Sequence, residues 1–240
     1  YFNATPYTAD QVDSLLIIGL AAGTIARQYS AVYPTIPMDG IEIDGGIVEA
    51  GARYFDMNAD VMPTLTVYVE DGRYMLNQIN KQYSVIAIDA YRPPYIPWHL
   101  TTVEFFSEVR THLSDDGVVA INVGRTPSDR RLVDALTATM LEVFPTVHAM
   151  DVPESFNTIL VATVQPTIAD NLIRNRDGLA ANAQTNPILR DTLDLAVNAL
   201  VPAIASDLVF TDDRAPVETL VDSLVLNFLF SDEINTLRPN

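Results

Sequence analysis

Short, continuous apolar runs recur along the first half of the chain, and most of them stop at a glycine or an acidic residue. Such runs are typical of strands in a parallel sheet, which are buried on both faces and therefore lack polar alternation. The pattern predicts strands at residues 14–19, 40–44, 65–69, 85–89 and 118–123. Between them, apolar residues recur every three or four positions, which predicts amphipathic helices. This alternation of strands and helices indicates an α/β fold with right-handed crossovers.

The second half of the chain departs from this alternation. An apolar run at 157–164 follows a strand-like stretch at 147–152 without a long helix between them. The two predict an antiparallel hairpin at the edge of a doubly wound, mostly parallel, seven-stranded sheet. We therefore expect one α/β domain at residues 1–165.

The tail that follows is helical in pattern. Apolar residues at helical spacing between Leu189 and Leu200 predict one amphipathic helix, and those between Val217 and Phe228 predict another. We expect residues 166–240 to form a C-terminal helical extension that packs on the same domain or on a partner copy in a homodimer.

Composition narrows the classes of function. The absence of cysteine excludes disulfides, zinc–thiolate sites and a cysteine nucleophile. No apolar run reaches the roughly 18 residues that span a bilayer, and the chain does not open on a secretory signal, so we expect a cytoplasmic protein with no membrane span in this chain. The formal net charge of −17, with Lys81 as the only lysine, argues against nucleic-acid binding. This net charge indicates either an acidic surface that is simply solvated or an electrostatic field that attracts amines.

Small and acidic residues stand where the first four predicted strands end. A turn of small residues, 19–23, follows the first strand and lets the backbone approach a ligand closely. Glu42 ends the second strand and is placed to accept hydrogen bonds from both hydroxyls of a ribose. Asp71 follows the third strand and suits an adenine amino group, while Asp89 ends the fourth and would face the reacting end of the ligand. The competing interpretation is that each acid only caps the helix after it.

Residues 14–123 resemble the catalytic domain of the spermidine synthases, the polyamine aminopropyltransferases. The matching segments are 15–24, 42–44, 71–73, 83–89, 101–106, 116–117 and, further on, 157–162. Segment 210–218 resembles a closing motif of a spermidine synthase-like subgroup that is often fused behind membrane segments. The resemblance implies the Rossmann-like fold of class I S-adenosylmethionine-dependent methyltransferases, and it implies that residues 1–165 form a Rossmann-like nucleoside-binding catalytic domain. It also implies decarboxylated S-adenosylmethionine or S-adenosylmethionine as co-substrate, methylthioadenosine as the product of the former, and no metal.

The resemblance assigns roles to individual residues. Asp89 would be the catalytic general base that takes the proton of an attacking amine. The expected contacts with the nucleoside are Gly19, Leu20, Ala22, Gly23, Glu42, Ile43, Asp71, Gly72, Asp89 and Ala90. A loop over the substrate is expected to contribute Tyr91, Arg92 and Trp98.

Three departures from the family pattern bear on the acceptor. Ala22 stands where the family has an aspartate that grips the ammonium of the donor, and Arg92 stands where it has a second aspartate. We also expect the family's N-terminal β-hairpin to be missing from this chain, because the sequence begins close to the first predicted strand. An inward-facing guanidinium about 4 Å from an ammonium, in place of a carboxylate, would cost roughly 8 kcal/mol at an effective dielectric of 20.

These departures shape the functional hypothesis. We expect a spermidine synthase-like aminopropyltransferase with altered or lost polyamine specificity, acting on a small-molecule amine or another nucleophile. The alternatives are an S-adenosylmethionine-dependent methyltransferase and a non-catalytic nucleoside-binding or assembly domain. Two further acids, Asp212 and Asp213, could reach the site, but we expect them to cap the last helix.

Overall fold

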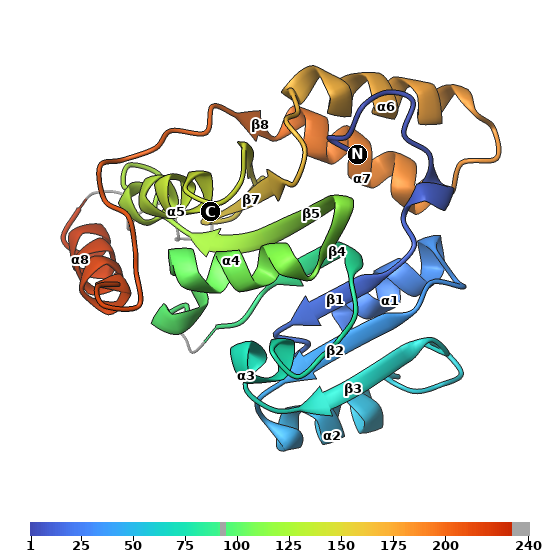
Figure 1. The fold of residues 1–240 in the computed structure, drawn as a ribbon, viewed down its shortest axis with the longest axis horizontal. Coiled ribbons are helices and arrows are strands. Elements are labelled where there is room, and N and C mark those ends of the chain that lie inside the picture. Colours follow the sequence, from blue (N-terminus) through green and yellow to red (C-terminus); the bar gives the residue numbers. More distant parts are fainter. Residues whose placement is uncertain (92–94, 232–240) are drawn as a thin grey trace.

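An eight-stranded sheet runs through the computed structural model, which describes residues 1–91 and 95–231 (Figure 1). The strand order is β3-β2-β1-β4-β5-β7-β6-β8, and β1 to β5 are parallel to one another. The strands are β1 (Leu15–Ile18), β2 (Met38–Glu42), β3 (Leu65–Val69), β4 (Tyr83–Ile88), β5 (Leu113–Gly124), β6 (Thr146–Asp151), β7 (Asn157–Thr163) and β8 (Leu200–Val201). This arrangement confirms the predicted α/β class with a mostly parallel sheet.

Helices connect the parallel strands and follow the hairpin. The α-helices are α1 (Thr24–Val32), α2 (Gly45–Tyr54), α3 (Gly72–Leu76), α4 (Val103–Thr111), α5 (Arg131–Leu141), α6 (Ala169–Ala181), α7 (Pro187–Asn198) and α8 (Val217–Leu229). Two short 3-10 helices are η1 (Ala9–Gln11) and η2 (Trp98–Leu100).

The central strand β1 shows why an unbroken apolar run forms here. All four of its residues are buried, and they alternate between the two faces of the sheet. Leu16 and Ile18 lie in the large core that also contains apolar side chains of α3, α4, α5 and α8. Leu15 and Ile17 belong to a second core with Ala26 of α1. The sheet is therefore covered on both faces, as a doubly wound fold requires.

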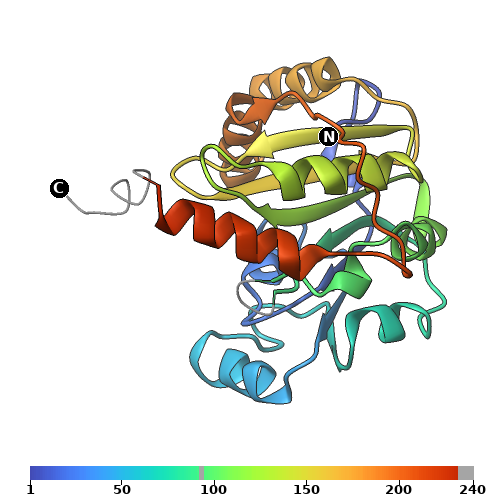
Figure 2. The ribbon, with the colours of Figure 1, turned by 90° about the vertical axis from the view of Figure 1, so that its left-hand side faces the viewer.

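The tail packs in two separate places. Leu172 and Leu179 of α6 and Leu189 of α7 form a third core with Phe2 near the N-terminus. Helix α8 lies at the other side of the molecule (Figures 1 and 2) and contributes buried Val221 to the large core. The division of the chain at residue 165 stays a prediction.

Two features of the second half differ from the sequence expectation. Strand β8 adds an eighth member to the predicted seven-stranded sheet, so the β6–β7 hairpin lies one strand in from the edge. This strand has only two residues, and its Leu200 continues the helical spacing of apolar residues that begins at Leu189. The sequence pattern therefore did not predict a strand here. Helix α6, which is rich in polar residues, was not predicted either.

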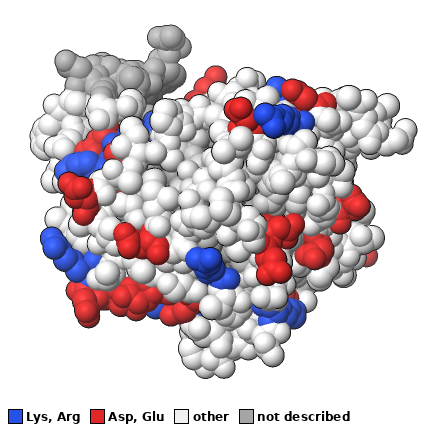
Figure 3. Space-filling view, turned by 45° about the horizontal axis from the view of Figure 1, so that its top comes forward, with Lys and Arg blue, Asp and Glu red and all other residues white. Residues whose placement is uncertain are grey.

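The surface carries the charge expected from composition, 31 acidic against 14 basic residues. On the face shown in Figure 3, the two kinds lie scattered between uncharged atoms. Among the described helices, none is both long and apolar enough to cross a membrane.

Candidate active site

The first four strands end together at one edge of the sheet. Ile18, the last residue of β1, pairs with Ile41 on one side and with Ile88 on the other, and Glu42 pairs with Val69 of β3. Because the strands are parallel and in this register, the turns that follow them lie side by side. The residues predicted to bind a nucleoside come from these turns.

The turn after β1 makes very close contact with the turn after β4. Gly19 has a φ of +89°, and a Cβ atom there would lie 2.5 Å from the carbonyl oxygen of Asp89 and 2.7 Å from the Cα of Ala90. Only glycine fits such a contact in this backbone region. Gly23 (φ +82°) begins α1, and a Cβ there would lie 2.9 Å from the sulfur of Met57.

The other residues of this turn differ in what they expose. The Leu20 side chain is buried and packs over Gly40, so only its backbone is available to a ligand. Ala22 is partly exposed and lies beside Gly51 of α2.

Glu42 is a buried acid that joins the turns after β1 and β2. Its Oε2 accepts a hydrogen bond of 2.8 Å from the backbone amide of Ala21, and its Oε1 accepts one of 3.1 Å from that of Asp44. It caps neither α1 nor α2, since Asp44 caps α2. The neighbouring Ile43 is 71% exposed, an unusual position for a large apolar side chain next to a buried acid.

Asp71 has two kinds of partner. Its Oδ1 accepts from the backbone amides of Arg73 and Tyr74 and thereby caps α3, as the competing interpretation predicted. Its Oδ2 lies 3.0 Å from Nε2 of His99 in η2, so it also binds a segment outside its own helix. Gly72 lets α3 begin tightly against β1, because a Cβ there would lie 2.5 Å from the Ile18 side chain.

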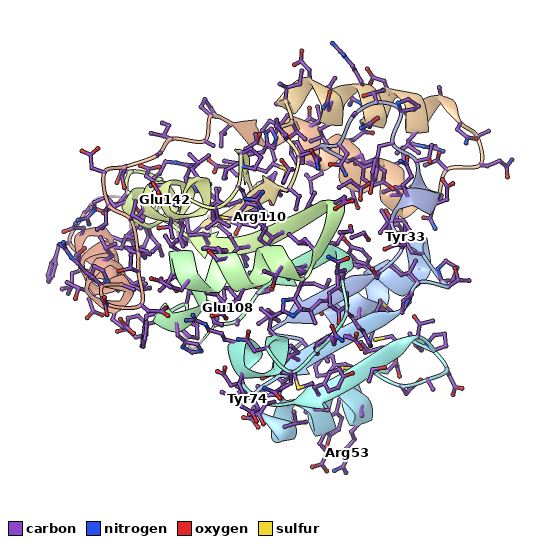
Figure 4. All side chains as sticks on the ribbon, in the orientation of Figure 1. Tyr33, Arg53, Tyr74, Glu108, Arg110 and Glu142 are labelled. Carbon is purple, nitrogen blue, oxygen red and sulfur yellow. The ribbon has the colours of Figure 1, made fainter. Side chains whose placement is uncertain are left out.

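Arg73 joins α3 to α4 and to the segment that precedes α8. It forms ion pairs of 2.6 Å with Glu108 and 2.8 Å with Asp212, and Asp212 also accepts from the hydroxyl of Thr102. Figure 4 labels Glu108 on α4, next to α3. The expectation that Asp212 caps the last helix is wrong, because Pro216, the N-cap residue of α8, has no side-chain cap and Asp212 binds Arg73 and Thr102 instead. The guanidinium and hydroxyl donors outcompete the helix end for this carboxylate.

Asp89 is joined to β5 by a short chain of hydrogen bonds. The amide nitrogen of Asn122 donates to Oδ1 of Asp89 at 2.9 Å, and the Tyr91 hydroxyl donates to the backbone oxygen of Asn122, also at 2.9 Å. Burial, and then the charge of Asp89, raise the pKa of Tyr91 above its usual value. Oδ1 of Asn122 is buried and has no hydrogen-bond partner in the described part of the chain.

The predicted substrate loop divides between two places. Tyr91 lies beside Asp89 and Asn122, whereas Trp98 lies in η2, 42% exposed and edge-on to His99, whose ring contacts Asp71. Arg92 lies outside the described residues.

Sequence reasoning did not single out Asn122 or the pairing of His99 with Asp71. One signal for Asn122 was present, because it is the only polar residue in the apolar run 118–123. The pairing of His99 with Asp71 depends on how η2 folds back over α3, which leaves no trace in spacing.

Solved structures of spermidine synthases and of a methyltransferase-like protein share this architecture. The chain is similar to a spermidine synthase from Thermotoga maritima, with a TM-score of 0.64 and 18% identity over 80% of this chain and 66% of that one. It is also similar to human methyltransferase-like protein 13 in complex with SAH, with a TM-score of 0.61 and 22% identity over 82% and 86% of the two chains. At these identities the likeness establishes the fold alone.

Sequence similarity narrows this class to one family. Residues 5–171 match the spermine/spermidine synthase domain, and the chain belongs to this family, as its motifs predicted. A probable polyamine aminopropyl transferase from Bifidobacterium longum is 31% identical over 230 residues, which are 90% of this chain and 51% of that protein. The chain thus spans about half the length of the curated relatives it matches.

Proposed function

We propose that this chain is a transferase that binds the adenosine part of a sulfonium donor across the ends of β1 to β4 and activates an acceptor at Asp89. The observation that carries the proposal is the double contact of the turn after β1. Gly19 packs against the backbone of Asp89, and Ala21 donates to Glu42. Glu42, which suits a ribose, and Asp89, which suits proton transfer, therefore both contact the turn after β1.

The described residues fit an adenosine in their hydrogen-bonding capacity. An ionised carboxylate has about four acceptor positions, and Glu42 uses two of them on backbone amides. The two that remain match the two hydroxyls of a ribose. Asp71 uses three positions, on Arg73, Tyr74 and His99, which leaves one for an adenine amino group. The exposed apolar side chain of Ile43 suits a ring face.

Asp89 is the residue best placed to accept a proton. Asn122 is the one side chain among the described residues that donates to it, so Oδ2 is open to an incoming amine. The unpartnered Oδ1 of Asn122 offers a second acceptor beside it. A bound sulfonium supplies its own leaving group: the amine nitrogen forms a bond to the carbon as the carbon–sulfur bond breaks, leaving a neutral thioether. Asp89 then takes the proton that the nitrogen loses.

Family membership supports an amine acceptor and decarboxylated S-adenosylmethionine as donor. Ala22, in the place of the ammonium-gripping aspartate, favours a second candidate, methyl transfer from S-adenosylmethionine. We further propose that polyamine specificity is altered, with poor turnover of putrescine. The cytoplasmic location expected from the sequence stays a prediction.

Calorimetric titration with S-adenosylmethionine, its decarboxylated form and methylthioadenosine tests the proposal. We expect Glu42→Gln and Glu42→Ala to weaken binding of the preferred nucleoside by about 1.5–3 kcal/mol, the range for hydrogen bonds to a charged group. Glu49→Gln removes an exposed charge from α2 and is the matched control, with unchanged affinity. Equal affinities for the Glu42 and Glu49 variants would remove Glu42 from the site.

Mass spectrometry of the products separates the candidates. A mass gain of an aminopropyl group on the acceptor supports the first donor, and a gain of a methyl group supports the second. Nucleoside binding without any product, over a panel of amines and other nucleophiles, would support a non-catalytic domain. Rapid formation of spermidine from putrescine would contradict the proposed change of acceptor.

A further inference from the structure

A cavity of about 390 Å³ lies between α8, the end of β5 and the turn that joins β6 to β7. Its volume falls in the range of roughly 300–1,000 Å³ that is usual for small-molecule sites. Leu224 and Phe228 of α8 form one wall, and Phe156 of the hairpin turn faces them. The rings of Phe156 and Phe228 meet edge to face, with their centroids 5.4 Å apart. Figure 2 shows α8 running along this side of the molecule.

Hydrogen bonds through Tyr91 and Asn122 link the cavity wall to the proposed base. Tyr91 lines the cavity and donates to the backbone of Asn122, whose amide donates to Asp89. Gly124, the last residue of β5, also lines it, and a Cβ there would lie 3.9 Å from the Tyr91 hydroxyl. Tyr91 and Asn122 therefore connect the cavity wall to Asp89.

The polar atoms of the cavity wall are largely turned toward protein partners. The Tyr91 hydroxyl is bound to Asn122, and Nε of Arg125 donates to Thr158. The hydroxyl of Thr126 accepts from the amide of Asp129. What the wall offers to a ligand is mainly hydrocarbon from α8 and from Phe156.

The charged groups around the cavity disfavour the binding of a second ammonium group, such as the far end of a diamine. No carboxylate belongs to the lining residues that the structure describes. The nearby Asp151 is shared by two guanidinium groups, Arg125 at 3.4 Å and Arg130 at 2.8 Å. An ammonium buried here would lose its hydration without gaining an unshared anion, which is unfavourable.

We propose that this cavity is a specificity site that takes the uncharged, apolar body of the acceptor, so that the acceptor class is monoamines with an aliphatic chain and not polyamines. The amino nitrogen faces Asp89, and the hydrocarbon chain lies under α8. The inference rests on the proposed function only in taking Asp89 as the base. The binding of the chain is a separate property of the cavity.

Two ligands of nearly equal size test the charge requirement. Pentylamine and putrescine have the same number of non-hydrogen atoms, but putrescine ends in an ammonium where pentylamine ends in a methyl group. Calorimetry in the presence of saturating methylthioadenosine should give at least tenfold tighter binding of pentylamine. From butylamine to octylamine, affinity should rise about fourfold per added methylene, the factor that corresponds to about 0.8 kcal/mol for each buried CH₂.

Two adjacent residues of α8 supply matched variants. Val225 lines the cavity and is 40% exposed, while Leu226 is 52% exposed and is not among the lining residues described. Both positions reach solvent, so an aspartate is tolerated at either. Val225→Asp should weaken octylamine binding at least tenfold and reduce the difference in affinity between octylamine and putrescine. Leu226→Asp should change neither quantity. Equal effects of the two variants, or equal binding of pentylamine and putrescine, would overturn the inference.

Product analysis with the same amines keeps the two proposals apart. Chain-length-dependent binding that is sensitive to Val225→Asp, without transfer from either donor, would support the cavity assignment and contradict the transferase proposal. Transfer to amines that is independent of chain length and of Val225→Asp would contradict the cavity assignment and leave the transferase proposal standing.

Discussion

Gly19 offers the most direct test of the contact between the turns after β1 and β4. Its φ of +89° lies in the left-handed region, and a Cβ atom would lie 2.5 Å from the carbonyl oxygen and 2.6 Å from the carbonyl carbon of Asp89. Both are backbone atoms, so they cannot rotate away as the end of a flexible side chain can. Gly19→Ala must therefore separate the two turns or strain them.

The magnitude follows from three terms. A left-handed conformation costs a non-glycine residue about 1–2 kcal/mol, overpacking costs a further ~1–3 kcal/mol, and the reduced entropy of the unfolded chain offsets ~0.4–1 kcal/mol. We expect Gly19→Ala to lower the free energy of unfolding by about 2–4 kcal/mol. Because the turn also carries Ala21, which holds Glu42, nucleoside affinity should fall as well.

Gly178 provides the matched control. It lies exposed within α6, and a Cβ atom there would meet nothing within 4 Å. Gly178→Ala should be neutral or stabilise the protein by up to about 1 kcal/mol, the helix propensity difference. Equilibrium urea unfolding followed by far-ultraviolet circular dichroism measures both variants. If Gly19→Ala unfolds at the same urea concentration as Gly178→Ala, the close contact with Asp89 does not exist and the site reasoning fails.

Two further predictions concern charged groups outside the proposed site. The Tyr83 hydroxyl donates to buried Asp39 at 2.6 Å, whereas that of Tyr68 lies 3.4 Å from it. Tyr83→Phe should therefore cost about 1.5–3 kcal/mol in urea unfolding, and Tyr68→Phe much less; equal losses would contradict this. Hydrogen bonds from Arg73, and also from Thr102, lower the pKa of Asp212 below its ordinary 3.8. The ionised Asp212 carboxylate therefore stabilises the folded protein fully above pH 3.8, and this stabilisation is lost as the pH falls further. The difference in unfolding free energy between the unmodified chain and Asp212→Asn should thus shrink when unfolding is measured from pH 6 down to pH 3. Asp213 is an exposed neighbour, and Asp213→Asn is the control. If the difference in unfolding free energy between the unmodified chain and Asp212→Asn grows on acidification, the lowered pKa assigned to Asp212 is refuted.

The parallel half of the fold could be predicted because both faces of the sheet are covered. Strand β1 is therefore apolar throughout and β4 is apolar except for Ser84 and the Tyr83 hydroxyl, and the two strands are followed by Gly19 and Asp89. The expected position of the strand ends follows from topology alone. Strand β8 could not be predicted, because its two residues depend on pairing with β6.

The contacts of the site acids were less predictable than their positions. The sequence places Asp71 after β3, but its bond to His99 bridges 28 positions in the chain. The pair of Arg73 and Asp212 bridges 139 positions. Such partners are selected by tertiary packing, so neither helix spacing nor strand alternation indicates them. The cavity under α8 has the same origin, because it forms between α8 and a hairpin turn that precedes it by about sixty residues.

The three strand-end acids differ in how many hydrogen bonds they already accept, and this difference fits a division of labour. Asp71 accepts from three donors and Glu42 from two, mostly backbone amides that hold each carboxylate in one orientation. A carboxylate that only recognises a nucleoside benefits from being fixed in advance, since less freedom is lost when the ligand binds. Asp89 accepts from Asn122 alone among the described residues, so most of its lone pairs remain free for an N–H group. An acid that must take a proton needs that freedom. Helix capping and ligand binding are therefore compatible roles at Asp71, while the single side-chain donor to Asp89 among the described residues is consistent with the role of base proposed for it.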